Sequence, residues 1–430
     1  MYQSAASMFK NKKVLILGFG REGMSTYRFL RNMYPDMHLT IADKNEIKLD
    51  DKNVTLICGD SYMDSLNDFD IVMKSPGIAF LDVDIKDGTL VTCQTDLFLK
   101  FAPCRKVGIT GSKGKTTTST LIYDMLKEGG FDARLIGNIG VPVLEDINTV
   151  TPETIAVIEM SSHQLEFTTS SPEVAVLTNI YEEHLDHYRD GFRGYVNAKL
   201  NIVRRQKESD TFIYNATQGL DGLCDLGKIK SHKVGVKKDA PLPFAVNNEH
   251  LLGEHNRQDI LFAFEAAKHF GVDTAAERAV EKFSGIEHRM EKVGTFRGIT
   301  FYNDCIATIP HAVECAVEAL KNVDTLIFGG MDRGLDYSEF ENYLKKSNIK
   351  NLIGTPETGH KICDKIEGAP SKNVYKAANL DEAVKKAYEV TAKGKICLLS
   401  PAASSYNCYK NFEEKGKHYK KLVREYGKED

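Results

Sequence analysis

The chain has few of the features that mark membrane, secreted or nucleic-acid-binding proteins. Its 430 residues contain no run of 18 or more apolar residues, so the sequence predicts no transmembrane helix and no membrane insertion. The first eight residues lack a basic stretch followed by an apolar one, and we expect no signal peptide. Lys and Arg total 56 and Asp and Glu total 60, which leaves a formal charge of −4. So small a charge provides no basic field, and we expect no nucleic-acid partner.

Cysteine is present, but without the spacing of a metal site. The nine cysteines are an odd number and are scattered, with no C-x-x-C pair. This pattern argues against a zinc site and against a disulfide framework. We therefore expect reduced thiols in a cytoplasmic protein. A composition of 42% hydrophobic and 27% charged residues is ordinary for a folded chain and excludes a disordered or low-complexity protein.

Short apolar runs alternate with helical patterns along the chain. The runs are mostly continuous, as in strands buried on both faces of a parallel sheet. They lie at residues 14–17, 39–42, 71–73, 107–110, 155–158, 174–177, 212–214, 325–328 and 396–399. Helical patterns at 22–33, 115–128 and 310–321 complete an α/β protein with mostly parallel sheets. The length suggests about three domains, which we place at residues 1–98, 99–285 and 286–430.

A first glycine-rich turn joins the run at 14–17 to the helical pattern at 22–33. It contains Gly18, Phe19, Gly20, Arg21 and Gly23, and the acidic Asp43 follows about 20 residues later. This G-x-G-x-x-G pattern places bare amides at a helix N-terminus, where they favour a phosphate. NAD, another nucleotide or diphosphate, and tight packing alone all remain open. Lys44 is either a further phosphate contact or a solvated lysine.

A second glycine-rich turn follows the run at 107–110. It comprises Gly111, Ser112, Lys113, Gly114, Lys115, Thr116 and Thr117. Backbone amides of such a P-loop cradle phosphates, the lysine neutralises them, and the threonine hydroxyl binds Mg²⁺. Ile109 stands where the strict pattern has glycine, but Gly111 provides a glycine inside the loop. We interpret this turn as an ATP site.

Polar side chains follow the next strands of the same sheet. Glu159 ends the run at 155–158, and a carboxylate there is a candidate Mg²⁺ ligand or a surface residue. His184 and His187 lie among three carboxylates after the run at 174–177, and such a cluster is either structural or functional. Lys199 lies in a helical pattern and, by itself, has the character of a surface lysine.

Several motifs together resemble those of the Mur ligases, the ATP-dependent amide ligases of peptidoglycan precursor synthesis. They are the segments 111–117, 138–140, 159–162, 183–187, 253–256 and 288–291, in the family's order. Segments 75–77, 161–166, 399–405 and 410–413 resemble the member that adds glutamate to UDP-N-acetylmuramoyl-L-alanine. The resemblance covers nearly the whole chain.

The resemblance implies three domains and a mechanism. An N-terminal Rossmann-like domain would bind the UDP substrate, a central P-loop domain would bind ATP, and a C-terminal Rossmann-like domain would bind the amino acid and close over the site. The substrate carboxylate would be phosphorylated by ATP to an acyl phosphate, which the amine of D-glutamate would attack. Domain closure would exclude water from that intermediate. We expect a monomer.

The resemblance also assigns roles to residues. Lys115, Glu159, His184 and Lys199 would be catalytic, with Lys199 carbamylated by CO₂ and with Thr116, Glu159, His184 and Lys199 around Mg²⁺. ATP would contact residues of the second turn, together with Asn256, Asp259, Arg289 and Asp304. The UDP substrate would contact Gly18, Phe19, Gly20, Arg21, Asp43, Lys44, Ser75, Asn138 and Gln164. The amino acid would contact Thr308, Arg333, Ser405 and Phe412.

The chain departs from the family pattern near the amino-acid site. Ile306 replaces a lysine expected close to the incoming glutamate, and Arg333 replaces another lysine. Asn407 replaces an aspartate, and Asp259 stands where asparagine is usual. Arginine still pairs with a carboxylate. D-Glutamate, L-glutamate and a different amino acid therefore all remain open as substrates.

Two further hypotheses differ in class. One is another ligase of the superfamily, such as a folylpolyglutamate synthetase, against which the N-terminal Rossmann-like domain argues. The other is a nucleotide-binding subunit without ligase activity. The chain argues against it because it retains Lys115, Thr116, Glu159, His184 and Lys199. The simple dehydrogenase interpretation of the first turn predicts tight NAD binding.

Overall fold

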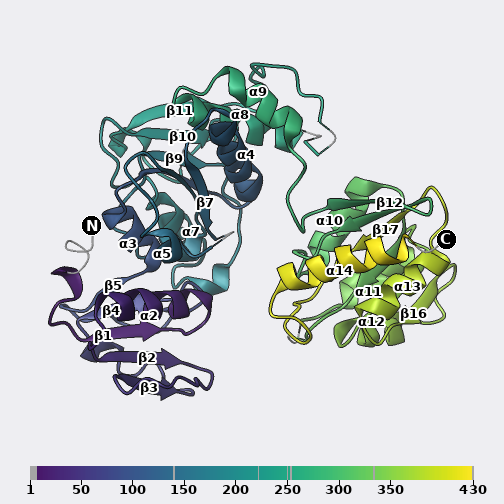
Figure 1. Cartoon of the computed structure of the whole chain (residues 1–430), viewed down its shortest axis with the longest axis horizontal. Coiled ribbons are helices and arrows are strands. Elements are labelled where there is room, and N and C mark those ends of the chain that lie inside the picture. The colour runs from purple at the N-terminus through teal and green to yellow at the C-terminus, as the bar shows by residue number, and fades with distance from the viewer. Residues whose placement is uncertain are drawn as a thin grey trace. The chain divides into compact units, whose positions relative to one another are not determined.

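The computed structural model describes residues 7–138, 141–220, 222–248, 250–251, 254–332 and 335–428. The chain forms two compact units, Met1–Phe283 and Ser284–Asp430 (Figure 1). Within the described residues, the first unit holds two sheets and the second holds one. Among the described residues, no helix combines the length and apolar character needed to cross a membrane.

The first sheet consists of five parallel strands, in the order β3-β2-β1-β4-β5. The strands are β1 (Val14–Leu17), β2 (Leu39–Asp43), β3 (Val54–Cys58), β4 (Ile71–Lys74) and β5 (Leu90–Thr92), accompanied by α2 (Arg21–Met33), η1 (Leu66–Asp68) and α3 (Gln94–Phe101). Alternate residues of β1 pack on opposite faces. Ile16 lies in a core cluster with Phe29 of α2, whereas Leu15 lies in a separate cluster with Leu66.

The second sheet has six parallel strands, in the order β11-β10-β9-β6-β8-β7. They are β6 (Arg105–Thr110), β7 (Ala133–Gly137), β8 (Ile155–Glu159), β9 (Val174–Leu177), β10 (Thr211–Asn215) and β11 (His232–Val236). The helices are α4 (Lys115–Glu128), α5 (Val143–Asp146), α6 (Ser162–Leu165), η2 (Leu185–His187), α7 (Gly191–Leu200), η3 (Leu226–Lys228), α8 (Glu254–Lys268) and α9 (Thr274–Lys282). Helix α4 packs against α8 and α9.

The first two sheets share one hydrophobic core. A single cluster of buried side chains contains Ile16 of β1, Phe98 of α3, Leu144 of α5 and Leu177 of β9. The position 98/99, where the sequence suggests a boundary, lies inside α3. The N-terminal sheet and the central sheet therefore belong to one compact unit.

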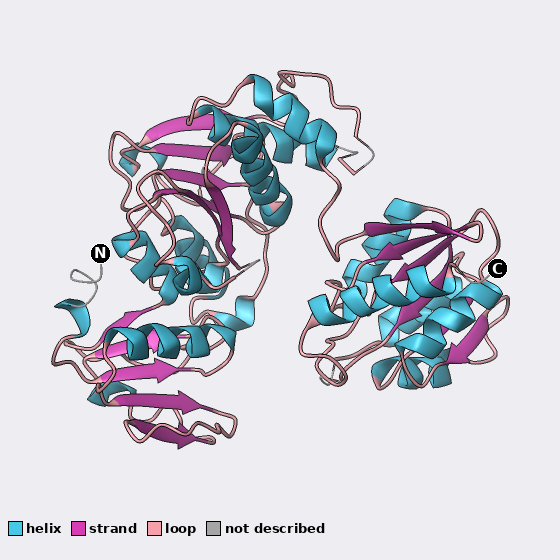
Figure 2. Cartoon of the chain, in the orientation of Figure 1, coloured by secondary structure: helices cyan, strands magenta, loops and turns pink. Residues whose placement is uncertain are grey.

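The second unit is a doubly wound sheet, in the order β12-β13-β17-β14-β15-β16. Its strands are β12 (Glu291–Phe296), β13 (Ile299–Asn303), β14 (Val323–Phe328), β15 (Asn351–Gly354), β16 (Asn373–Lys376) and β17 (Ile396–Leu399), with α10 (Pro310–Leu320), α11 (Ser338–Lys346), α12 (Thr358–Ile366), α13 (Leu380–Val390) and α14 (Phe412–Tyr426). Only β12 is antiparallel to its neighbour. Helices flank the sheet on both faces (Figure 2).

The predicted α/β class with mostly parallel sheets is confirmed. Each of the nine apolar runs lies within a strand, and the three helical patterns correspond to α2, α4 and α10. The carboxyl ends of parallel strands meet at one edge of a sheet, which is where ligands bind in open α/β folds. The candidate residues after β1, β6, β8, β9, β13, β14 and β17 all follow such ends.

Candidate functional site

The loop between β6 and α4 can form only with glycine at two positions. Gly111 has a φ of +152°, and a Cβ there would lie 1.9 Å from the Thr178 hydroxyl oxygen. Gly114 has a φ of +82°, and a Cβ there would lie 2.4 Å from an oxygen of Asp259. Thr118 donates to the same Asp259 oxygen over 3.1 Å. Asp259 therefore lies directly against the loop.

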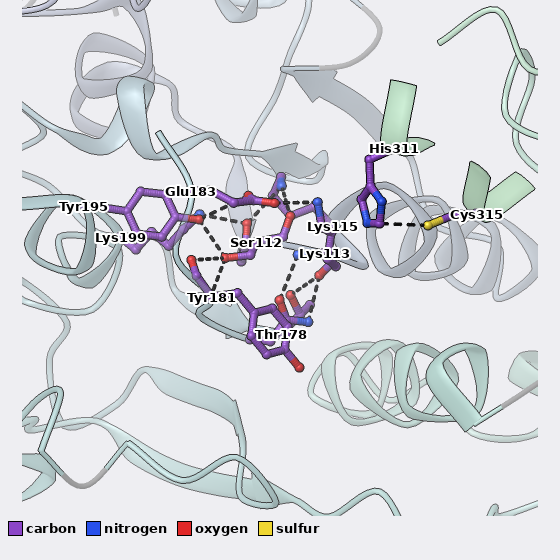
Figure 3. A network of polar contacts seen from close by, with 12 residues as sticks. Ser112, Lys113, Lys115, Thr178, Tyr181, Glu183, Tyr195, Lys199, His311 and Cys315 are labelled. Carbon is purple, nitrogen blue, oxygen red and sulfur yellow. Dashed lines mark hydrogen bonds and ion pairs between the residues drawn. The ribbon is translucent and has the colours of Figure 1, made fainter. Parts of the chain in front are cut away.

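Two lysines turn toward this loop from different helices (Figure 3). Lys115 Nζ, at the start of α4, donates to the carbonyl oxygens of Gly111 and Ser112, each over 2.9 Å. Lys199 Nζ, on α7, donates to the same Gly111 oxygen over 2.7 Å. Lys199 is 2% exposed, so its interpretation as a surface lysine is wrong. Burial, and then the charge of Lys115, lowers the pKa of Lys199 well below its ordinary value.

The neighbouring strand end holds the loop in place. The Ser112 and Tyr195 hydroxyls lie 2.7 Å apart, and the Tyr181 amide donates to Ser112 Oγ over 2.8 Å. The Lys113 amide donates to the Asn179 side chain over 2.8 Å, and the Thr178 hydroxyl donates to the Lys113 carbonyl over 2.6 Å. The Lys113 side chain pairs with Glu183.

None of Thr178, Asn179, Tyr181 or Tyr195 was among the predicted site residues. The signal available in the sequence was their position directly after β9 or on the helix that carries Lys199. Hydroxyl and amide side chains are common in such places, so that position alone does not single them out.

Glu159 is the last residue of β8, and only one of its carboxylate oxygens accepts a hydrogen bond within the described ranges. It is 1% exposed, and its Oε1 accepts from Asn138 Nδ2 over 2.7 Å. Its Oε2 is buried with no hydrogen-bond partner among the described residues. Its negative charge acts on Lys199, whose pKa it raises against the dominant effect of burial. A buried oxygen without a donor, close to a lysine, fits a cation ligand.

Three histidine rings lie together, His163 from α6 and His184 and His187 from the segment after β9. His184 adopts a left-handed backbone with a φ of +54°. The His163 ring lies 4.9 Å from the His184 ring and 3.9 Å from the His187 ring. Burial, followed by the charges of His187 and His184, lowers the pKa of His163 to about 3. His163 is thus neutral at neutral pH, and the sequence interpretation missed it.

No group of three or more His, Cys, Asp or Glu side chains is arranged to hold a metal ion within the described ranges. The metal set predicted from the resemblance contains only two residues of these types, Glu159 and His184. Thr116 is buried in the first turn of α4. The remaining ligand of the predicted set is Lys199, which would need a carbamate to serve.

The N-terminal turn is fixed by its own acidic residue. Asp43 accepts from the Phe19 amide over 2.7 Å and from the Asn45 amide over 2.8 Å. Ser75 Oγ donates to the Gly18 carbonyl over 2.9 Å. A Cβ at Gly23 would lie 1.9 Å from that same carbonyl oxygen. The turn, Asp43 and Ser75 are therefore brought together as expected.

The other predicted contacts lie at different points of the first unit. Gly20 caps α2, Arg21 begins that helix, and Lys44 is exposed after β2. Gln164 Nε2 donates to Glu22 Oε1 over 2.7 Å and so joins the central sheet to the N-terminal turn. Thr117 lies in the first turn of α4 and Asn256 in α8.

In the second unit, Asp304 follows β13 and is 4% exposed. It accepts from the Met290 amide over 3.1 Å and from Ser400 Oγ over 2.8 Å. Burial raises its pKa to about 6, against the lowering effects of those bonds and of Arg289. The structure thus brings the predicted residues Arg289 and Asp304 together.

The predicted amino-acid contacts follow three neighbouring strands or begin a helix. Thr308 lies between β13 and α10, Ser405 follows β17, and Phe412 begins α14. Ser405 Oγ is buried without a hydrogen-bond partner among the described residues. Arg333 lies outside the described residues, and so does Gly334.

The chemistry of the first unit is that of a phosphate site. Lys115 donates to the carbonyls of Gly111 and Ser112, and a bound anion offers its ammonium a stronger acceptor. A strand, a glycine loop and a helix bearing Lys-Thr define the class as P-loop nucleotide-binding proteins.

Comparison with known proteins identifies the family within that class. Residues 12–91 match the Mur ligase MurD-like N-terminal domain, 109–246 the Mur ligase middle domain, and 288–403 the Mur ligase glutamate ligase domain. The chain is 33% identical to the UDP-N-acetylmuramoylalanine–D-glutamate ligase of Clostridium kluyveri, and the match covers 97% of each chain. This chain belongs to the Mur ligase family.

Solved structures share the fold. The UDP-N-acetylmuramate–alanine ligase MurC of Thermotoga maritima matches with a TM-score of 0.57 and 18% identity, over 97% of this chain and 100% of that one. The MurF ligase of Thermotoga maritima, solved in complex with ADP, matches with a TM-score of 0.56 and 16% identity, over 96% and 95%.

Proposed function

We propose that this protein is an ATP-dependent ligase that adds D-glutamate to UDP-N-acetylmuramoyl-L-alanine in peptidoglycan precursor synthesis. The full-length similarity to a relative that bears this activity in its name supports the substrates. The observation that carries the chemistry is the pair Lys115 and Lys199 on the Gly111 carbonyl, with Glu159 close by. This arrangement suits the transfer of a phosphoryl group to a carboxylate.

The reaction begins with activation of a poor acyl donor. The carboxylate of the substrate's alanine attacks the γ-phosphate of ATP and forms an acyl phosphate, with ADP as the leaving group. Carboxylate and triphosphate repel each other, and Lys115 with the loop amides offsets that repulsion. The amine of glutamate then attacks the acyl carbon, loses a proton and expels phosphate, which leaves an amide.

Mg²⁺ and a carbamate on Lys199 complete the proposal. Mg²⁺, held by Glu159, Thr116, His184 and the carbamate, would neutralise phosphate charge as it develops. The residues fit: Glu159 has a buried oxygen without a donor, and the lowered pKa of Lys199 keeps more of its amine neutral. Only a neutral amine reacts with CO₂, and the resulting anion is a ligand whereas an ammonium is not.

The remaining substrate contacts are likewise proposed. The turn at Gly18–Gly20 with Arg21, Asp43, Lys44 and Ser75 would bind the UDP group, and Asn138 and Gln164 would contact the rest of that substrate. Asn256, Asp259, Arg289 and Asp304 would contact ATP, and Thr308, Arg333, Ser405 and Phe412 the amino acid. The domain bounds 1–98, 99–285 and 286–430 and a monomeric state belong to the proposal as well.

L-Glutamate is the second candidate, and Ile306 is the observation that favours it. That residue lies just after β13, where the family pattern has a lysine, so the amino-acid site has lost one cation. A change of charge on one side of a chiral substrate can alter which enantiomer fits.

The test supplies ATP, Mg²⁺ and UDP-N-acetylmuramoyl-L-alanine and measures phosphate release with D-glutamate and with L-glutamate in parallel. We expect release with D-glutamate and not with L-glutamate. Release with L-glutamate alone would contradict D-glutamate as the substrate and support L-glutamate. No release with either would contradict both and favour a nucleotide-binding subunit. We also expect that a direct titration with NAD detects no binding.

A further inference from the structure

Lys415 is a buried lysine that has no carboxylate partner in the part of the chain that the structure describes. It lies on α14 and is 3% exposed. Its Nζ donates to the Gly329 carbonyl over 2.9 Å. The ionisable groups that act on it are the thiols of Cys305 and Cys408, and among the described residues no carboxylate does so. Burial lowers the pKa of Lys415.

A charged lysine in this environment lowers the stability of the folded state. An ammonium has three donors, and burial without a counter-ion is unfavourable even when one carbonyl accepts. A methionine would pack on the same helix face without that penalty. The unpaired charge therefore indicates that an anion binds nearby during function.

The position of Lys415 shows where such an anion would bind. Gly329 follows β14, Cys305 follows β13, and Cys408 lies in the segment after β17, so the groups that contact or act on the ammonium come from beyond the carboxyl ends of three adjacent parallel strands. Ligands bind at such an edge. Ser405, which follows β17, has a buried Oγ without a hydrogen-bond partner among the described residues. Phe412 lies three residues before Lys415, on the same face of α14.

The neighbouring sequence lacks the cation expected there. Ile306 directly follows Cys305, and the resemblance to the Mur ligases places a lysine at Ile306. A dicarboxylic amino acid brings two carboxylates and needs cations to hold them.

We propose that Lys415 is a specificity-determining residue of the amino-acid site: its ammonium binds a carboxylate of the incoming dicarboxylic amino acid, in place of the cation that Ile306 does not provide. This inference rests on the proposed function. The carboxylate joins or replaces the Gly329 carbonyl as acceptor, and Ser405 Oγ donates to the same substrate.

The test compares K415M with the wild type in steady-state turnover. We expect the KM for D-glutamate to rise about 10- to 100-fold, the loss typical of a charged hydrogen bond. The KM values for ATP and for the UDP substrate should stay within about twofold. Acyl phosphate formed without glutamate, trapped with hydroxylamine, should also be unchanged. The matched control is K421M, because Lys421 is an exposed lysine of the same helix that pairs with Glu425.

A rescue variant separates binding from a structural role. In I306K/K415M the lysine returns on the loop after β13, and we expect the KM for D-glutamate to fall at least fivefold from the K415M value. An unchanged KM in K415M, or equal losses for all three substrates without rescue, would overturn the inference. If K415M does not fold, I306K alone decides: a lower KM for D-glutamate supports a site short of cations, and an unchanged KM overturns it.

The proposed function fails in a different way. It fails if the wild type releases no phosphate with glutamate, whatever residue 415 is. The inference fails if the wild type turns over but K415M leaves the KM for D-glutamate unchanged, or raises all three KM values equally without rescue by I306K.

Discussion

Burial changes the acid–base behaviour of Lys199. A solvated lysine stays protonated at neutral pH and does not react with CO₂. In this fold the side chain is withdrawn from water beside Lys115, and both effects disfavour the ammonium. Because the pKa is lowered, the Lys199 amine stays neutral down to a lower pH than an ordinary lysine does. The pH range in which the proposed carbamate can form is therefore wider at its acidic end.

The variant K199A should therefore lose turnover by at least a thousandfold while it keeps its fold. The wild type should lose activity in CO₂-depleted buffer and regain it on addition of bicarbonate, and this dependence should steepen as pH falls. Phosphate release and thermal unfolding measure both effects. The control is K233A, because Lys233 is an exposed lysine that donates to the Ile229 carbonyl. Wild-type activity in K199A would remove the carbamate from the account.

The buried carboxyl of Asp304 makes the free energy of unfolding depend on pH. Burial raises its pKa to about 6 from the ordinary 3.8, so the folded state binds its proton more tightly than the unfolded state does. Stability from this group is present below about pH 4 and is lost as pH rises through about 6. D304N should therefore be more stable than the wild type at pH 7, by on the order of 2 kcal/mol, and about equal near pH 4. Urea unfolding at both pH values checks this, and a constant difference would contradict it.

Residue types and spacing were enough to locate many of the candidate residues. Lys115 begins a helix and Glu159 ends a strand, where the pattern of apolar runs placed them, whereas Asp304 was located by the resemblance alone. The burial of Lys199 and Lys415 could not be predicted, because both lie in amphipathic patterns and their surroundings come from distant segments. His163 was missed for the same reason, since its partners His184 and His187 follow the next strand.

At the scale of elements, the strand–glycine–helix turns carry the function. In the first turn, Gly23 allows α2 to approach the Gly18 carbonyl, whereas a Cβ at Gly20 would meet nothing within 4 Å. We expect G23A to destabilise the protein by about 2 kcal/mol or more through this clash. G20A, the matched control in the same turn, should unfold within about 2 °C of the wild type. Thermal unfolding of both variants tests this, and equal behaviour would contradict the close approach.

Most of the fully buried strands were predicted, whereas the edge strands and the inner strands β13 and β15 were not. Runs such as 14–17 and 174–177 are apolar throughout because both faces of their strands are covered. In strand β3, two consecutive residues, Thr55 and Leu56, are exposed. In strand β16, the first and the last residue are exposed. Edge strands of this kind resemble loops in hydrophobicity, and their pairing is fixed by the sheet that they join.

At the scale of the whole molecule, a buried ion pair joins the first two sheets. Lys74 ends β4, and its Nζ lies 3.1 Å from Glu166 Oε2, while His187 Nε2 lies 3.4 Å from the same oxygen. The Lys74 side chain is 2% exposed and lies over the rings of Phe80 and Phe167. Breaking such a pair leaves a charge buried without its partner.

We expect K74M and E166Q each to lower the free energy of unfolding by about 2–3 kcal/mol. The double variant should lose clearly less than the sum, because no buried charge is then left unpaired. A double-mutant cycle in urea measures the coupling. Additive losses would mean that the pair does not hold the two sheets together.

The amide bond to glutamate is the chemical outcome that defines the proposed activity. The most direct measurement incubates the full chain with ATP, Mg²⁺, UDP-N-acetylmuramoyl-L-alanine and racemic glutamate, then determines the product mass and the enantiomer that remains. We expect one glutamyl residue added per phosphate released, with L-glutamate left behind. Consumption of L-glutamate, or phosphate release without a glutamyl product, would contradict the account.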